Sequence, residues 1–187
     1  VITGPAYIGK KSLVRVGAKI YGGTSIGPVC KIGGEVEGSI FQAYSNKQHD
    51  GFLGHSFIGE WVNLGADTNN SDLKNNYGNV SFHSYLSDSK VDSGTMFLGT
   101  MIGDHAKLGI NTSINTGCVI GIGSNLYGPN LISGFIPDFS WGQASQLVRY
   151  RFDRFCATAA SVKARRGLEF SPAETELFHV LHGRSGG

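Results

Sequence analysis

The sequence predicts an all-β solenoid, a left-handed parallel β-helix of hexapeptide repeats, followed by a short C-terminal helical segment. Two observations carry this prediction: branched aliphatic residues recur every six positions, and 28 of the 187 residues are glycine, against about 7% in an average protein. A period of six fits neither an α-helix nor simple strand alternation, but it fits three short strands per turn of a triangular coil. The aliphatic positions are Ile2, Ile8, Val14, Ile20, Ile26 and Ile32, then Ile58 and Leu64, and finally Ile102, Leu108, Ile114 and Ile120.

A small or β-branched residue follows each aliphatic residue four positions later, as Ala6, Ser12 and Ala18 illustrate in the first block. We expect the aliphatic residues to point inward, the small residues to fit near the corners, and the glycines to serve the turns. Stacked coils of this kind bury continuous aliphatic ladders and pair each strand with the coils above and below it.

The period breaks twice, at residues 41–51 and 69–95, where the sequence is polar and rich in asparagine. Long insertions in solenoids emerge on one face and often carry function. We therefore predict a solenoid domain over residues 1–136 with loop insertions near 41–51 and 69–95. The second insertion is either a functional loop or a surface excursion rich in Asx turns.

Residues 137–187 follow a different pattern and are predicted to be an α-helical segment. Ser140 to Gln143 fits a capping box, and Ser171 to Glu174 fits a second one with proline at the first turn. We expect these helices to cover the open end of the solenoid or a neighbouring subunit. The apolar stripe of the first helix is Val148, Phe152, Phe155, Ala159 and Val162.

Composition narrows the function classes. The net charge of +2 gives no general case for nucleic acid or membrane binding. The chain has no apolar run of membrane-spanning length, and we expect no signal peptide. Cys30, Cys118 and Cys156 are far apart and are expected to be reduced thiols of a cytoplasmic protein. The repeat is already in phase at Ile2, and the first residue is not methionine, so we expect a fragment of a longer protein.

Two stretches resemble a known family. Residues 46–66 read NKQHDGFLGHSFIGEWVNLGA and residues 102–114 read IGDHAKLGINTSI. Together with the repeat, they resemble the C-terminal acetyltransferase domain of bifunctional N-acetylglucosamine-1-phosphate uridylyltransferase/glucosamine-1-phosphate acetyltransferase and of related sugar-1-phosphate nucleotidylyltransferases. The resemblance covers roughly residues 1–127, and the helical tail indicates a divergent branch.

The resemblance implies a homotrimer that uses acetyl-CoA as a co-substrate and acts on a small sugar phosphate. His49 would be the general base, since neutral imidazole is available near neutral pH, and Asn63 would contact the sugar. Mg²⁺ would be needed only if a nucleotidyltransferase domain is attached. The remaining implied contacts are Lys47, Phe52 and Lys74 for the substrate, and Ala66, Thr100 and Thr116 for acetyl-CoA.

Four positions depart from the family pattern. Phe52 stands in place of an active-site tyrosine, Asp72 in place of an asparagine, and Glu37 in place of a phosphate-binding lysine. A phosphate-binding arginine of the family falls on Tyr21, or on Lys19 if no gap is allowed. The loss of two cations weakens the case for a phosphorylated substrate, because each charged hydrogen bond contributes about 1.5–3 kcal/mol. Two interpretations stay open: an acetyltransferase, or a lapsed trimerisation and regulatory domain of a nucleotidyltransferase whose N-terminal domain is absent from this chain.

A third interpretation, a zinc-dependent hydratase, would require a metal site formed by histidines. Some hexapeptide-repeat proteins hold zinc through a His-x4-His pair on adjacent coils. His49 and His55 have five residues between them, and no cluster of zinc-ligand type accompanies them. No metal site is therefore predicted.

Overall fold

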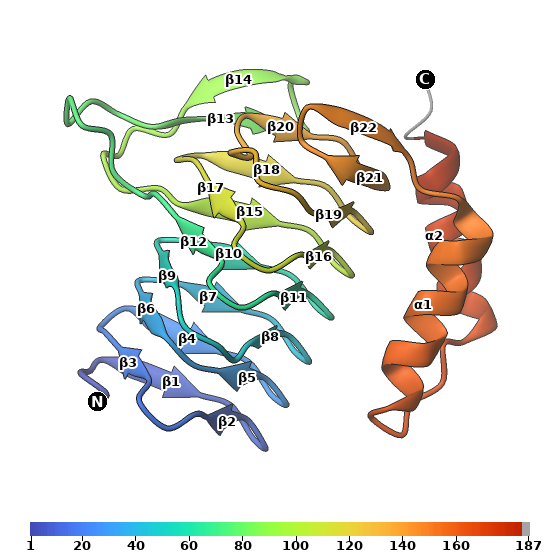
Figure 1. Ribbon diagram of the computed structural model, residues 1–187, viewed down its shortest axis with the longest axis horizontal. Helices are drawn as coiled ribbons and strands as arrows, with labels where there is room; N and C mark the ends of the chain where they lie inside the picture. The colour runs from blue at the N-terminus through green and yellow to red at the C-terminus, as the bar shows by residue number, and fades with distance from the viewer. Residues whose placement is uncertain (185–187) are drawn as a thin grey trace.

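A computed structural model describes residues 1–184 and confirms the predicted solenoid (Figure 1). The coils contribute short strands to three faces, and the strands of a face pair in parallel with those of neighbouring coils, except that the ladder of the third face is interrupted between β9 and β12. The first face contains β1 (Ala6–Ile8), β4 (Thr24–Ile26), β7 (Ile40–Phe41), β10 (Phe57–Ile58), β15 (Thr100–Ile102), β18 (Cys118–Ile120) and β20 (Phe135–Ile136).

The second face contains β2 (Leu13–Val14), β5 (Lys31–Ile32), β8 (Asn46–Lys47), β11 (Asn63–Leu64), β16 (Lys107–Leu108), β19 (Asn125–Leu126) and β21 (Ser140–Gln143), with β22 (Gln146–Arg149) antiparallel at its end. The third face contains β3 (Lys19–Ile20), β6 (Glu35–Glu37), β9 (Phe52–Gly54), β12 (Asn69–Asn70) and β17 (Ser113–Ile114).

The three faces meet at three corners. Corner one joins the first face to the second, corner two joins the second to the third, and corner three joins the third to the first. One inward side chain per strand fills the centre, and the predicted aliphatics from Ile20 to Ile120 form a single buried core. Protein interiors are close-packed, so a polar group inside this core needs a hydrogen-bond partner.

Lys47 is one such polar group, and it explains why the predicted insertion at 41–51 is wrong. Residues 41–51 stay in the coil, because Phe41, Lys47 and Leu53 continue the six-residue spacing as inward residues of β7, β8 and β9. Lys47 pairs with Ile32 of the preceding coil and is only 1% exposed. Because a lysine stands where the repeat otherwise has an aliphatic residue, the six-residue pattern cannot be recognised here from the sequence.

One excursion leaves the solenoid between β12 and β15. It carries a β-hairpin of β13 (Ser81–Ser84) and β14 (Ser89–Asp92), which folds back along the last coils in Figure 1. The ring of His83 stacks on that of Phe135 with centroids 3.8 Å apart, and the hydroxyl of Tyr85 donates to Asp138 at 2.7 Å. The hairpin is therefore packed against the outside of the solenoid.

The first part of the tail differs from the prediction, and the second capping box is confirmed. The Ser140–Gln143 segment is strand β21 rather than a capping box, because it continues the β19 ladder and then turns into β22. Helices α1 (Phe152–Ala164) and α2 (Pro172–Arg184) follow. The capping box at α2 is confirmed, since the Ser171 amide donates to Glu174 at 2.9 Å and the Glu174 amide donates to Ser171 Oγ at 3.2 Å.

The helices lie along the side of the solenoid at corner one rather than over its open end (Figure 1). Aromatic side chains of this corner stack from coil to coil, with Tyr44 and Trp61 parallel at 4.2 Å. Phe155 and Phe178 of the helices pack against His105 of the same corner. The tail thus covers the corner with a second apolar cluster, which includes Phe139, Tyr150, Phe155, Ala159 and Phe178.

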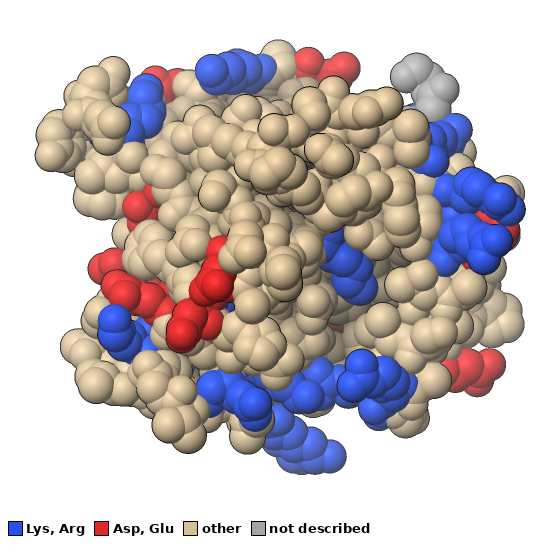
Figure 2. Space-filling model, in the orientation of Figure 1, with Lys and Arg blue, Asp and Glu red and all other residues tan. Residues whose placement is uncertain are grey.

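Figure 2 shows lysine and arginine side chains gathered over these helices. Four of the arginines rim a groove of about 770 Å³ along α1, whose apolar walls include Trp141 and Tyr150. No helix in residues 1–184 is long and apolar enough to cross a membrane.

Candidate functional site

Corner three carries glycine at one position of the turn in four coils, and histidine at that position in the coil of β10. The residue three places before the inward residue of the first face is Gly23, Gly38, Gly99 or Gly117 in four coils, His55 in a fifth, and Pro5 and Ser133 in the first and last coils. His55 has a φ of 46°, similar to the 53° of Gly38 and the 62° of Gly117. Histidine tolerates this left-handed conformation better than most residues do, but three other coils use glycine, which adopts it freely, at Gly23, Gly38 and Gly117.

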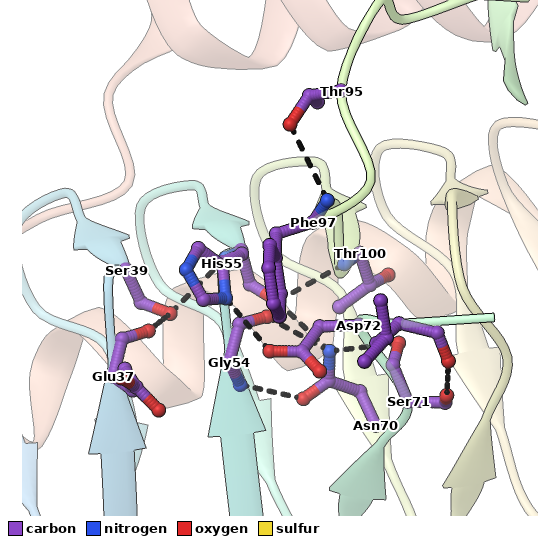
Figure 3. A network of polar contacts seen from close by, with 12 residues as sticks. Glu37, Ser39, Gly54, His55, Asn70, Ser71, Asp72, Thr95, Phe97 and Thr100 are labelled. Carbon is purple, nitrogen blue, oxygen red and sulfur yellow. Dashed lines mark hydrogen bonds and ion pairs between the residues drawn. The ribbon is translucent and has the colours of Figure 1, made fainter. Parts of the chain in front are cut away.

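The imidazole of His55 is paired with a carboxylate (Figure 3). His55 Nδ1 lies 2.7 Å from Asp72 Oδ2, with the two side chains 32% and 14% exposed. An ionised carboxylate can only accept, so Nδ1 donates to it, and Nε2 of the neutral ring then carries the lone pair. This is the arrangement of a base held by an orienting group.

The two ends of the excursion bring Asp72 and Phe97 to this corner. Leu73 and Phe97 form an antiparallel bridge, and the amide of Leu98 donates to the carbonyl of Asp72 at 2.9 Å. The Phe97 ring then lies over the imidazole of His55 with the centroids 5.0 Å apart. Residues 55, 72 and 97 are far apart in sequence and meet only because the excursion closes at its base.

Two glycines leave room for these side chains. A Cβ atom on Gly38 would lie 2.8 Å from Cδ2 and 3.0 Å from Nε2 of His55. A Cβ atom on Gly54 would overlap the Asp72 carboxylate and lie 2.5 Å from the ring of Phe52. Phe52, a predicted substrate contact, therefore borders the same corner as the pair.

A layer of hydrogen bonds supports the pair from inside the coil. The side chain of Asn70 takes the place of a backbone strand partner, since its Oδ1 accepts from the Gly54 amide at 2.8 Å and its Nδ2 donates to the Gly54 carbonyl at 2.9 Å. Thr100, a predicted acetyl-CoA contact, belongs to this buried layer. Its side chain is fully buried and donates to the carbonyl of Cys118 at 2.9 Å, so Thr100 does not reach the surface of this chain.

His49 and Ala66 lie at corner two, at the other end of the third face. They line a groove of about 650 Å³ together with Arg15, Gln48 and Asp67. The His49 side chain is exposed, and none of the hydrogen bonds within residues 1–184 involves it. The structure thus brings His49 together with Ala66, one of the three residues predicted for acetyl-CoA, but it gives His49 no orienting partner within residues 1–184.

Lys47 supports the His49 turn from below instead of facing a substrate. Its Nζ donates to the carbonyls of His49 at 2.6 Å and Asp50 at 3.1 Å. Burial lowers the pKa of Lys47 to about 8. The predicted substrate contact is therefore an interior cation that fixes the backbone of corner two.

The other predicted residues lie elsewhere. Asn63 is on the outer surface of the second face, where its Oδ1 accepts from Asn46 Nδ2 at 3.4 Å. Lys74 and Thr116 line a third groove of about 660 Å³ beside the hairpin, and Lys74 Nζ donates to the Asn79 carbonyl at 2.8 Å. Among residues 1–184, no group of three or more histidine, cysteine or acidic side chains could hold a metal ion.

Sequence reasoning missed the pairing of His55 with Asp72. The available signal was the position of His55, because glycine stands at the equivalent place of the repeat in four other coils. The partner had no such signal, since Asp72 lies in the polar excursion among many asparagines. Only the closure of the excursion places the two side chains together.

Comparison with known proteins supports the resemblance. No family model matches the chain. The bifunctional sugar-1-phosphate nucleotidylyltransferase/acetyltransferase of Sulfurisphaera tokodaii is 34% identical over 93 residues, which make up 50% of this chain and 23% of that protein. The bifunctional protein GlmU of Synechococcus sp. strain CC9311 is 28% identical over 160 residues, 83% of this chain and 31% of that protein.

A solved structure agrees with the fold. The crystal structure of the polySia-specific acetyltransferase NeuO superimposes with a TM-score of 0.52 at 12% identity, covering 86% of this chain and 93% of that one. The chain is thus a hexapeptide-repeat protein of the left-handed β-helix class. Its sequence relatives within that class are bifunctional sugar-1-phosphate nucleotidylyltransferase/acetyltransferases, and it spans less than a third of the length of the two described above.

Proposed function

We propose that this chain is the acetyltransferase part of a cytoplasmic sugar-nucleotide enzyme. It transfers an acetyl group from acetyl-CoA to the amino group of an amino-sugar-1-phosphate. The observation that carries the proposal is the groove at corner two, where His49 and Ala66, assigned by resemblance to proton transfer and to acetyl-CoA, line one cavity. Its volume of about 650 Å³ lies within the usual range for small-molecule sites.

The reaction needs a base but no covalent enzyme intermediate. The amine nitrogen of the acceptor attacks the thioester carbonyl, forming a C–N bond as the C–S bond breaks. A histidine accepts the proton that the nitrogen loses, and the departing thiolate of CoA is protonated in turn. The resemblance assigns the histidine to His49, and general-base catalysis of this kind contributes about 10²–10⁴-fold.

A second candidate function is a trimerisation and regulatory domain for an attached nucleotidyltransferase. The first face supports it, because the outer surface carries exposed apolar side chains that a partner solenoid would bury. Tyr7 is 61% exposed, Ile40 46% and Phe57 42%. The two functions are compatible with one homotrimer, and they differ in whether acetyl-CoA is turned over.

Thiol release from acetyl-CoA in the presence of glucosamine-1-phosphate tests the proposal. Wild-type turnover that falls at least 100-fold in His49→Ala would support acetyl transfer with His49 as base, provided that sedimentation shows an unchanged trimer. The matched control is His179→Ala, on the surface of α2. A trimer that neither binds acetyl-CoA nor releases thiol with a panel of amino-sugar phosphates would refute acetyl transfer and favour the scaffold function.

A further inference from the structure

We infer that Arg15 binds the phosphate group of the acceptor in the groove at corner two, and that Asp50 and Asp67 attract its amino group. The inference rests on the proposed function and keeps His49 as the base. It assigns the residues that select the substrate, although the phosphate-binding lysine of the related family is absent. Arg15 is a specificity-determining residue and takes no part in the proton transfer.

Arg15 supplies the positive charge of the groove. Among the described residues, it is the only lysine or arginine that lines this groove. Its side chain is exposed, and within residues 1–184 its guanidinium takes part in no hydrogen bond or ion pair. Lys19, the next cation along the chain, is instead paired with Glu35 at 3.3 Å. A planar guanidinium matches the oxygens of a phosphate group through parallel hydrogen bonds, so Arg15 is available to bind one.

The ladder of the second face sets the distance between Arg15 and His49. Val14 pairs with Ile32 of the next coil, and Ile32 pairs with Lys47 of the coil after that. Arg15 and His49 follow Val14 and Lys47 directly or at one remove, so they lie two coils apart at the same corner. At about 4.8 Å per coil, their backbones are separated by about 10 Å along the solenoid.

The coil between Arg15 and His49 leaves the groove open. Its residues at this corner are Gly33 and Gly34, which have no side chains to fill the space. A Cβ atom on Gly33 would lie 3.2 Å from the Cβ of Arg15, and Gly34 has a φ of 69°. A ligand in the groove can therefore contact both side chains without crossing a third one from the coil between them.

The end of the groove beside His49 is acidic. Asp50 and Asp67 stand on adjacent coils, where the Asp67 amide donates to the Asp50 carbonyl at 3.1 Å. Both side chains are exposed, and neither carboxylate takes part in a hydrogen bond or ion pair within residues 1–184. Burial lowers the pKa of Lys47 beneath this turn, and the two carboxylates oppose that effect. Two negative charges outweigh this one cation, so this end attracts a protonated amino group.

The groove is thus positive at one end and negative at the other. This pattern is complementary to a zwitterion that carries a phosphate and an ammonium group on adjacent carbons, as a 2-amino-sugar-1-phosphate does. A phosphate at Arg15 directs the amino group toward His49, and the reverse orientation brings the phosphate against the carboxylates. The bound ammonium group releases one proton to solvent, and the neutral amine then attacks the thioester while His49 accepts the second proton.

Thiol release with two acceptors tests the role of Arg15. The ratio kcat/KM is measured with glucosamine-1-phosphate and with glucosamine, which lacks the phosphate. In Arg15→Gln we expect kcat/KM for glucosamine-1-phosphate to fall by about 10–100-fold, the effect of one lost charged hydrogen bond, and the value for glucosamine to stay unchanged. Arg15→Lys should recover part of the loss. Lys10→Gln, which removes the same charge from the same coil at corner one, should change neither value.

Calorimetric titration measures binding without turnover. Wild type should bind glucosamine-1-phosphate more tightly than glucose-1-phosphate, which lacks the amino group. Asp67→Asn should reduce this preference by about two- to fivefold, the usual size of an exposed ion pair. Asparagine keeps the shape of the side chain and tolerates the φ of 57° at this position, so the variant tests the charge alone. An unchanged preference in the double variant Asp50→Asn with Asp67→Asn overturns the assignment of the amino group.

The outcomes separate the inference from the proposed function. An active wild type whose Arg15→Gln variant loses the same factor with both acceptors, or nothing with either, overturns the inference and leaves acetyl transfer standing. A wild type that releases no thiol but binds glucosamine-1-phosphate, and loses this binding in Arg15→Gln, overturns acetyl transfer and supports the phosphate site. A wild type that binds none of these ligands and releases no thiol overturns both.

Discussion

The buried histidine of corner one should make the protein lose stability in mild acid. His105 is 5% exposed, packs against Phe155 and Phe178, and has no hydrogen-bond partner at Nδ1 within residues 1–184. Burial, with Lys107 and Lys163 nearby, lowers its pKa from 6.5 to about 3. Between pH 6.5 and 3 the unfolded chain therefore binds a proton at this position and the folded chain does not.

The sign and size follow from proton linkage. The contribution of His105 to the free energy of unfolding is complete above the pKa of histidine in the unfolded chain. It decreases as the pH falls below that pKa, by up to about 1.4 kcal/mol per pH unit. Between pH 8 and pH 5 the contribution of His105 to the free energy of unfolding should fall by about 2 kcal/mol. Burial raises the pKa values of Glu60 and Asp104, and these neighbouring carboxyl groups act in the opposite direction.

A difference measurement isolates His105. Urea unfolding of wild type and His105→Phe is followed at pH 8 and pH 5, and the change with pH is compared between the two proteins. Strain from phenylalanine at the positive φ of 60° is the same at both pH values and cancels, as do the carboxyl contributions. Equal pH dependence in both proteins, within about 0.5 kcal/mol, would refute the assignment of a neutral buried imidazole.

Two further predictions concern stability. Lys47→Met should lower the free energy of unfolding by about 1–3 kcal/mol, because the carbonyls of His49 and Asp50 lose their donor. Urea unfolding measures this change, with Lys31→Met on the neighbouring coil as the control. A Lys47→Met protein more stable than wild type would contradict the prediction. Phe178→Ala should cost about 3 kcal/mol and expose α2 to limited proteolysis, whereas Leu177→Ala, at a side chain that is 55% exposed, should leave the digestion pattern unchanged.

The sequence predicted the solenoid because the repeat is a local rule, applied again in each coil. Where one residue breaks the rule, the prediction failed for a physical reason. Lys47 occupies an inward position that only its three backbone acceptors make tolerable, and those acceptors are invisible to a hydropathy pattern. The sequence pattern therefore predicts an insertion at 41–51 where the structure has three strands of the coil.

Long-range pairing explains the error in the tail. Ser140 and Gln143 have the spacing of a capping box, but Ser140 Oγ donates to the Pro137 carbonyl at 2.7 Å and its strand continues the ladder of β19. Helix α1 starts only at Phe152. Nothing in an apolar stripe specifies which surface it will cover, so corner one could not be predicted as the docking site of the helices.

The candidate site was only partly predictable for a related reason. The resemblance assigned single residues by position, and His49 and Ala66 do lie in one groove. The pairing of His55 with Asp72 depends on how a 29-residue excursion, residues 71–99, closes at its base, which is tertiary information. Thr100 is assigned to acetyl-CoA by resemblance, but in this chain its side chain is buried inside the coil.

The tail along corner one also changes how the solenoid can unfold. A bare stack of coils interacts only with its nearest neighbours, so its ends can fray one coil at a time. Here Arg166 donates to Asn46 at 3.0 Å across 120 residues of sequence, and Lys163 lies 5.6 Å from the ring centroid of Trp61. The helices therefore connect the coils between Asn46 and β22. Unfolding of one of these coils would weaken the contacts that the helices make with the other coils. This part of the protein is expected to melt as a single cooperative unit, while the coils before β7, which the tail does not reach through these contacts, open independently.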